Sequence, residues 1–153
     1  MTEDPSEVFG KSYPYLMPVE TSSELSPYYM WEKRIPVSEI ERASNISGIK
    51  DIAVESLTIS NRVRNFKIIA ESGEHIFPAK ELRKNLGWDK LPSTMITNIA
   101  KSEEIYIFEG KGYGHGVGMC QWTALDMAKK GMNYREIISK FYPGTTIEVY
   151  ENR

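Results

Sequence analysis

The residues best suited to binding or catalysis lie together in one stretch, GKGYGHGVGMCQW at 110–122. Glycine occupies every second position from Gly110 to Gly118, with Tyr113, His115 and Met119 among the residues between and after the glycines. An imidazole and a phenol can each donate and accept hydrogen bonds, so they suit contacts with the hydroxyl groups of a ligand. Glycine within a strand often marks the close approach of a ligand or of another backbone. This stretch is therefore the first candidate for a functional site.

The spacing in this stretch excludes two phosphate-binding loops. A Walker A loop needs glycines five apart followed by lysine and a hydroxyl residue, and a dinucleotide loop needs a three-residue step, whereas every gap between these glycines is even. Metal binding has too few ligands, because His115 and Cys120 are close in sequence but the only other histidine is the distant His75. We therefore expect no metal and no cofactor in this chain.

Even spacing suits an extended chain, because successive side chains of a strand point to opposite sides. We therefore expect 110–118 to be extended, with Tyr113 and His115 on one side and bare backbone on the other, against which a flat ring could lie. Two alternatives stay open. The glycines could form a bend that lets the following helix pack on the sheet, and His115 could be a hydrogen-bonded core histidine.

Alternating apolar residues predict most of the strands that would position this stretch. They predict an edge strand at 31–38, since Pro36 interrupts the ladder, and a hairpin or meander within 49–71. They also predict paired strands at 94–99 and 103–109 and a last strand, TTIEVY, at 145–150. The strands and helices do not alternate strictly, so the expected fold class is α+β with mixed or antiparallel strands and a few short helices.

Helices are expected where capping residues flank an apolar face. Ser38 with Glu41 forms a capping box for a short helix that ends by Gly48, and Asn133 with Glu136 forms another for a helix at 134–142. FPAKELRKNLGW predicts a helix with Pro78 in its first turn and Gly87 after its end. A further helix is expected at 121–130, directly after the glycines. The first 30 residues, rich in proline and tyrosine, predict an irregular lead-in.

Composition limits the class of protein. The 153 residues, 41% hydrophobic, predict one folded domain over 1–153. A net charge of −2, with both signs mixed along the chain, argues against a nucleic-acid-binding surface. No segment approaches the length of a membrane span, and the N-terminus has no basic, then apolar, export signal. The single cysteine rules out an internal disulfide and leaves the redox compartment open.

A longer motif surrounds the glycines. GYGHGVGMCQWTALDMAKKGMNYREIISKFYPGTTI, at 112–147, resembles the C-terminal signature of the SpoIID/LytB family, the stage II sporulation protein D-like and amidase-enhancer-like proteins. SPYYMW at 26–31 and ELRKNLGW at 81–88 support the resemblance more weakly. The chain departs from the signature at Cys120, where the family commonly has serine, and at Thr123, where it commonly has glycine.

The resemblance implies a role on the glycan strands of bacterial peptidoglycan. SpoIID-like proteins are lytic transglycosylases that break the MurNAc-GlcNAc β-1,4 bond with the sugar's own C6 hydroxyl. That chemistry needs one carboxylic acid that acts first as acid and then as base. The family's acid lies in a P-x-E-M segment for which this chain has no counterpart, so we expect a C-terminal portion that lacks the family's N-terminal segment.

The expected substrate contacts are Tyr113, His115 and Gln121, and the catalytic residue is unknown. The nearest acids, Glu109 and Asp126, suit solvated faces and receive no catalytic role. A non-catalytic glycan-binding or amidase-enhancing module and a structural half-domain are the alternative functions. The expected partners are glycan strands, the missing N-terminal half and other cell-wall hydrolases. The family implies a location in the cell envelope, outside the cytoplasm.

Overall fold

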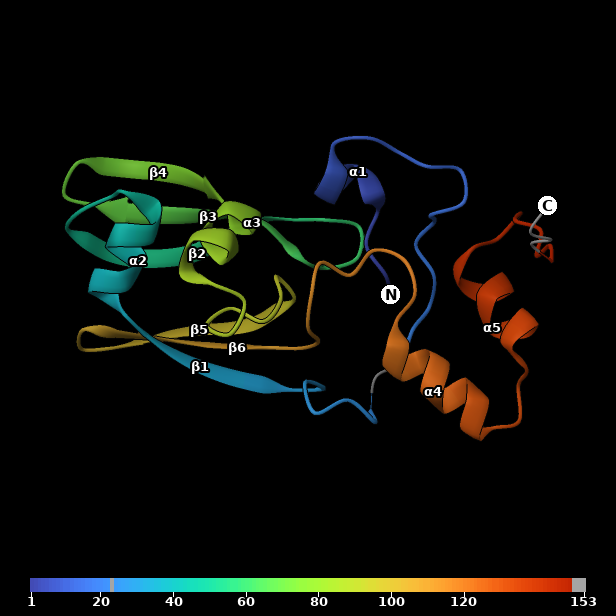
Figure 1. Ribbon diagram of the computed structural model, residues 1–153. Coiled ribbons are helices and arrows are strands. Elements are labelled where there is room, and N and C mark those ends of the chain that lie inside the picture. Colours follow the sequence, from blue (N-terminus) through green and yellow to red (C-terminus); the bar gives the residue numbers. More distant parts are fainter. Residues whose placement is uncertain (23, 150–153) are drawn as a thin grey trace. The chain divides into compact units, whose positions relative to one another are not determined.

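The computed structural model describes residues 1–22 and 24–149 and divides the chain into two compact units. The central unit is 26–116, and the terminal unit comprises the described residues within 1–25 and 117–153. Every strand of the described residues belongs to the central unit (Figure 1). The terminal unit contains three helices, which are α1 (Pro5–Phe9), α4 (Gln121–Lys129) and α5 (Tyr134–Phe141). One domain over 1–153 stays a prediction.

The central unit contains two antiparallel sheets of three strands each. One sheet has the order β1-β6-β5, formed by Trp31–Pro36, Ile105–Gly110 and Ile96–Ser102. The other has the order β2-β3-β4, formed by Ile49–Leu57, Val63–Ala70 and Gly73–Pro78. The hairpin in 49–71, the paired strands before the glycines and the edge position of β1 are confirmed, as is the α+β class.

Two helices complete the core of the central unit, α2 (Val37–Ser44) and α3 (Ala79–Leu86), which pack against each other. Phe66 of β3 and Phe108 of β6 are fully buried and meet edge to face, with ring centroids 6.2 Å apart. Burying a side chain of this size stabilises the fold by about 1.5–3 kcal/mol. α3 ends at Leu86 and has Gly87 as its C-cap, as expected, with the Gly87 N–H donating to the Arg83 carbonyl. Contrary to the expectation, Pro78 does not lie in the first turn, because it ends β4 and is the N-cap residue of α3.

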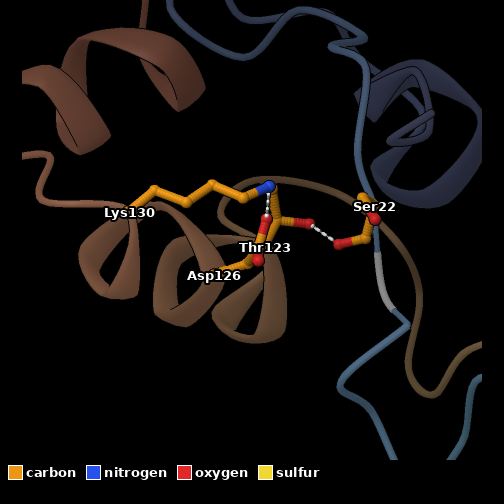
Figure 2. A network of polar contacts seen from close by, with 4 residues as sticks. All are labelled: Ser22, Thr123, Asp126 and Lys130. Carbon is orange, nitrogen blue, oxygen red and sulfur yellow. Dashed lines mark hydrogen bonds and ion pairs between the residues drawn. The ribbon is translucent and has the colours of Figure 1, made fainter.

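The terminal unit is held together by polar contacts as well as by buried Met127 and Phe141. The Asn133 and Glu136 capping box at the start of α5 is confirmed, since each side chain accepts from the other residue's backbone N–H. Figure 2 shows the Thr123 hydroxyl donating to the Ser22 carbonyl. Thr123, a departure from the family signature, thus ties α4 to the N-terminal segment of the same unit.

Three further sequence-based expectations are wrong. α2 begins after Pro36 without a side-chain cap, and Glu41 accepts instead from the Gly48 and Ile49 N–H groups at 2.6 and 3.1 Å. Residues 145–149 form no strand, and Tyr150 lies outside the described residues. β6 ends at Gly110, so 110–118 is not one extended segment.

Candidate functional site

The glycine loop, residues 110–116, begins at the last residue of β6 and belongs to the central unit. Its first residue must be glycine for lack of space. A Cβ at Gly110 would overlap the Trp31 ring and would lie 2.6 Å from the Met95 carbonyl oxygen. Real Cβ atoms do not come so close to backbone, so Gly110 lets β6 pass between these two groups.

The remaining glycines of the loop have a conformational role. Gly112, Gly114 and Gly116 have φ of +73°, +93° and +83°, a region that L-residues with a side chain rarely adopt. Gly118, the next glycine, continues the pattern with φ +80°. The even spacing therefore comes from a repeated left-handed backbone conformation. The expected bare face of an extended strand does not form.

Three hydrogen bonds to its main chain fix the glycine loop, two from backbone groups and one from the Trp31 indole. The Gly112 N–H donates to the Tyr28 carbonyl at 2.6 Å, and the Trp31 indole Nε1–H donates to the Gly112 carbonyl at 2.9 Å. On the other side, the Gly114 N–H donates to the Pro92 carbonyl at 2.9 Å. The position of Tyr113, between these two glycines, is thus defined by main-chain contacts on both of its neighbours.

Ser93 adds further hydrogen bonds that hold the loop. It is fully buried, and its hydroxyl donates to the Lys111 carbonyl at 2.5 Å while accepting from the Met95 N–H at 3.1 Å. The Lys111 N–H in turn donates to the Met95 carbonyl at 2.9 Å. Each such bond contributes about 1 kcal/mol net, so together they hold the loop rigid.

Two exposed tyrosines meet at this loop. Tyr113 is 50% exposed and Tyr28 is 37% exposed, and their ring centroids lie 4.7 Å apart with the planes tilted by 42°. Lys111 Nζ lies 5.9 Å from the centroid of Tyr29, which is also exposed. Aromatic faces next to a cation and rigid backbone suit ligands that combine apolar faces with polar edges.

His115 is exposed and its imidazole is biased towards the neutral form. Partial desolvation of the ring is the main cause that lowers the pKa of His115 below its ordinary value, and the charges of Arg83 and Arg62 lower it further. A neutral imidazole has one donor and one acceptor nitrogen, whereas the imidazolium has two donors. The neutral form of His115 therefore has one donor and one acceptor nitrogen.

Both arginines lie inside the fold. Arg62, between β2 and β3, is 7% exposed, and a Cβ on Gly116 would lie 2.6 Å from its Cζ and 2.7 Å from its Nε. Arg83 of α3 is 8% exposed and donates from Nε to the Leu91 carbonyl and from Nη2 to the Pro92 carbonyl, at 2.9 and 2.8 Å. Glycine at 116 leaves room for the Arg62 guanidinium. The Arg83 guanidinium donates to the Pro92 carbonyl, which also accepts from the Gly114 N–H.

The predicted site residues divide between the two units. Tyr113 and His115 share the glycine loop of the central unit, while Gln121 is the exposed first residue of α4 in the terminal unit. Glu109 is exposed on β6, opposite Glu32 of β1. Asp126 forms an ion pair with Lys130 at 2.7 Å, also visible in Figure 2. The surroundings of these two acids are those of solvated surface carboxylates.

Sequence reasoning missed the residues that support the loop, although a signal for them was present. Tyr28 and Trp31 belong to SPYYMW, and Arg83 and Trp88 belong to ELRKNLGW, the two weaker stretches of the family resemblance. In the fold the first stretch hydrogen-bonds with Gly112 of the glycine loop. The second stretch hydrogen-bonds with the Pro92 carbonyl, which accepts from Gly114 of the loop. Treating these stretches as a shell around the loop would have identified them.

The described residues contain neither a cluster of metal-ligand side chains nor a helix that could span a membrane. Within 1–22 and 24–149, no three histidine, cysteine, aspartate or glutamate side chains are grouped as metal ligands would be. In the same part of the chain, no helix has the length and apolar character needed to cross a bilayer.

Comparison with known proteins gives the family. The family model described as domain of unknown function DUF8618 matches residues 19–118. The amidase enhancer of Bacillus subtilis is 42% identical over 73 residues, which cover 48% of this chain and 10% of that protein.

Longer alignments extend the similarity to nearly the whole chain. An uncharacterized protein of Brachyspira hyodysenteriae is 30% identical over 156 residues, covering 97% of this chain and 40% of that one. Stage II sporulation protein D of Bacillus subtilis is 25% identical over 147 residues, covering 95% of this chain and 41% of that protein. The chain thus spans about two fifths of the length of these two relatives. It belongs to the family described as domain of unknown function DUF8618 and is a SpoIID/LytB-like protein.

Proposed function

We propose that this chain is the glycan-contacting portion of a protein that acts on the strands of bacterial peptidoglycan. The observation that carries the proposal is the exposed ring of Tyr113 on a loop fixed by main-chain hydrogen bonds, paired with the exposed ring of Tyr28, whose carbonyl accepts from that loop. The names of two relatives, stage II sporulation protein D and amidase enhancer, support a role in the cell wall or in sporulation. Peptidoglycan lies outside the cytoplasmic membrane, so we propose that the protein works there.

The chemistry of the loop suits an uncharged sugar. Pyranose rings have apolar faces that pack on aromatic rings, and Tyr113 and Tyr28 offer such faces. The exposed imidazole of His115, biased towards the neutral form, is a polar group that sugar hydroxyls can approach. Because Gly112 and Gly114 are already held in place, little conformational entropy is lost when a sugar binds. Gln121, in the terminal unit, is proposed as a separate contact with a hydroxyl or acetamido group.

For the whole protein we propose lytic transglycosylase chemistry. The C6 hydroxyl of a MurNAc residue attacks C1 of the same sugar as the bond from C1 to the GlcNAc O4 breaks. A carboxylic acid protonates O4, and the resulting carboxylate accepts the proton of the C6 hydroxyl, which gives a 1,6-anhydro product. We assign this acid to a part of the protein beyond these 153 residues, because Glu109 and Asp126 have solvated surroundings.

A second candidate is a non-catalytic module that enhances an amidase. It is favoured by the 42% identity to the amidase enhancer, the highest identity among the relatives described above, over 73 residues. Both candidates require glycan binding at the glycine loop. They differ in whether the whole protein releases 1,6-anhydro products.

Isothermal titration of this chain with chitohexaose and with peptide-free glycan tests the shared requirement. We expect Tyr113→Ala and His115→Gln each to weaken binding about tenfold, because each removes one stacking or hydrogen-bonding group. Tyr134→Ala is the matched control, since Tyr134 is an exposed tyrosine of the terminal unit, 57% exposed. Gln121→Ala tests the third contact separately.

The outcomes separate the hypotheses. No measurable binding by the wild-type chain would refute the proposed function. Binding that Tyr113→Ala and His115→Gln leave unchanged would refute the assigned site. Mass spectrometry of glycan digested by the full-length protein then decides between the candidates, because only the lytic enzyme releases 1,6-anhydro sugars.

A further inference from the structure

Trp88 stands out among the exposed residues of the central unit. It is 50% exposed, whereas Trp31 of the same unit is 8% exposed. Large aromatic side chains usually bury most of their surface, so a half-exposed tryptophan needs a reason. One reason for its position is that the ring shields Arg83 from solvent, because the Arg83 guanidinium lies over the Trp88 ring at 4.2 Å from its centroid. That contact occupies only part of the indole.

The indole is held in a defined orientation. Arg83 is buried and its guanidinium donates to the Leu91 and Pro92 carbonyls, so the group on which the ring packs is held by two hydrogen bonds. The backbone around Trp88 is equally constrained, because the Lys90 and Leu91 N–H groups both donate to the Gly87 carbonyl, at 3.2 and 3.1 Å. An exposed ring that is already immobilised loses little entropy on binding a ligand.

Trp88 and the glycine loop share one hydrogen-bonded frame. The Pro92 carbonyl accepts from both Arg83 Nη2 and the Gly114 N–H. The guanidinium of Arg83 also lies close enough to Tyr113 for the tyrosine to affect the pKa of Arg83. One buried residue therefore supports the Trp88 ring and fixes the carbonyl that positions Tyr113 and its neighbours.

The exposed part of Trp88 has the chemistry of a sugar platform. Half of its surface is exposed, and an indole combines a planar apolar ring with one N–H donor at its edge. Planar apolar surface with a polar edge suits a pyranose ring, and a glycan strand presents such rings at regular intervals. Like the indole, Tyr28 and Tyr113 are exposed aromatic rings next to a fixed polar frame.

We propose that Trp88 is a second sugar-binding platform, which contacts a ring of the same glycan strand beyond the one at Tyr113, with Arg83 as its positioning residue. This inference rests on the proposed glycan binding and adds a subsite to it. It implies that the site contacts at least two sugar rings of one strand. The contribution of Trp88 should therefore be larger with an oligosaccharide than with a single sugar.

Chain-length dependence provides the test, measured by titration calorimetry with N-acetylglucosamine and chitohexaose. We expect Trp88→Leu to weaken chitohexaose binding about tenfold and to affect N-acetylglucosamine binding much less, because a single ring cannot contact both platforms at once. Trp88→Phe keeps an aromatic face and should restore most of the affinity. Tyr134→Leu is the control, since Tyr134 is an exposed aromatic next to an arginine, with Arg135 at 5.3 Å from its ring.

A measurement on the wild-type chain avoids any effect of the substitution on folding. The three tryptophans give three indole N–H signals in a nuclear magnetic resonance spectrum, and chitohexaose should shift that of Trp88. Equal chitohexaose affinity in wild type and Trp88→Leu, or equal losses with both sugars, would overturn the second platform. An unshifted Trp88 signal at saturation would also overturn it. If neither sugar binds the wild-type chain, the proposed function itself fails.

Discussion

Replacing Gly110 with alanine tests why the first glycine of the loop is needed. The added Cβ would overlap the Trp31 ring and lie 2.6 Å from the Met95 carbonyl oxygen. Trp31 cannot easily move, because it is buried and its indole donates to the Gly112 carbonyl. The Met95 carbonyl is also engaged, since it accepts from the Lys111 N–H. The substitution must therefore displace backbone on one side or a packed indole on the other.

The cost follows from these contacts. Overpacking a well-packed site costs about 1–3 kcal/mol. Losing the hydrogen bond between Lys111 and Met95 adds about 1 kcal/mol. We expect Gly110→Ala to lower the free energy of unfolding of the central unit by about 3 kcal/mol, within the range of large single-site effects.

Gly112→Ala is the matched control. A Cβ at Gly112 meets nothing within 4 Å, and only its φ of +73° opposes a side chain. A left-handed conformation costs an alanine about 1 kcal/mol, so the central unit should be only slightly weakened. The two substitutions add the same methyl group two residues apart and differ mainly in the space available for it.

Hydrogen exchange of the Phe108 amide reports the comparison, because Phe108 lies in the middle strand of its sheet and is fully buried. We expect its exchange to accelerate about a hundredfold in Gly110→Ala and about fivefold in Gly112→Ala, as each 1.4 kcal/mol corresponds to a factor of ten. Equal acceleration in the two variants would refute close packing as the reason for Gly110.

Three further changes test single contacts. Thr123→Val should lower the stability of the terminal unit by about 1 kcal/mol in urea denaturation, because the bond to the Ser22 carbonyl is lost, and unchanged stability would contradict that bond. Tyr106→Phe should be neutral or stabilising in the same assay, since the buried Tyr106 hydroxyl has no hydrogen-bond partner among the described residues, and burial raises its pKa to about 12. Desolvation and two nearby arginines lower the pKa of His115 in the folded protein below 6.5. Between that lowered pKa and 6.5 the unfolded state binds more protons than the folded state, so the free energy of unfolding falls as the pH drops through this window. His115→Gln should remove that part of the pH dependence in urea denaturation between about pH 7.5 and about pH 5.5, and an identical slope in both proteins would show that the imidazole titrates normally.

Local patterns in the sequence predicted the elements that carry the site. Alternation in 49–71 and before the glycines was sufficient for two antiparallel hairpins, and Pro36 was sufficient for the edge position of β1. Asn133 with Glu136 predicted the start of α5 because both halves of the capping box are local. The same reasoning wrongly predicted a capping box of Ser38 with Glu41. The Glu41 carboxylate accepts instead from the Gly48 and Ile49 N–H groups of the following turn.

The conformation of the glycine loop could not be predicted from spacing alone. A period of two is shared by an extended strand and by a chain in which every second residue has positive φ, and glycine permits both. Only the surrounding contacts decide between them, and the partners Tyr28 and Pro92 are distant in sequence from Gly112 and Gly114. Arg83 was equally hidden, because nothing local shows that a helix residue supports a loop through a shared carbonyl.

This difference changes what the repeated glycines contribute. In an extended strand they would leave a bare surface for a flat ligand. In the observed loop they let main-chain N–H groups of Gly112 and Gly114 turn towards internal carbonyls, which leaves Tyr113 and His115 as the exposed groups. A ligand therefore meets side chains on a rigid frame, so the affinity should depend on Tyr113, His115 and Trp88. Alanine at Gly112 should weaken binding only as far as it moves those side chains.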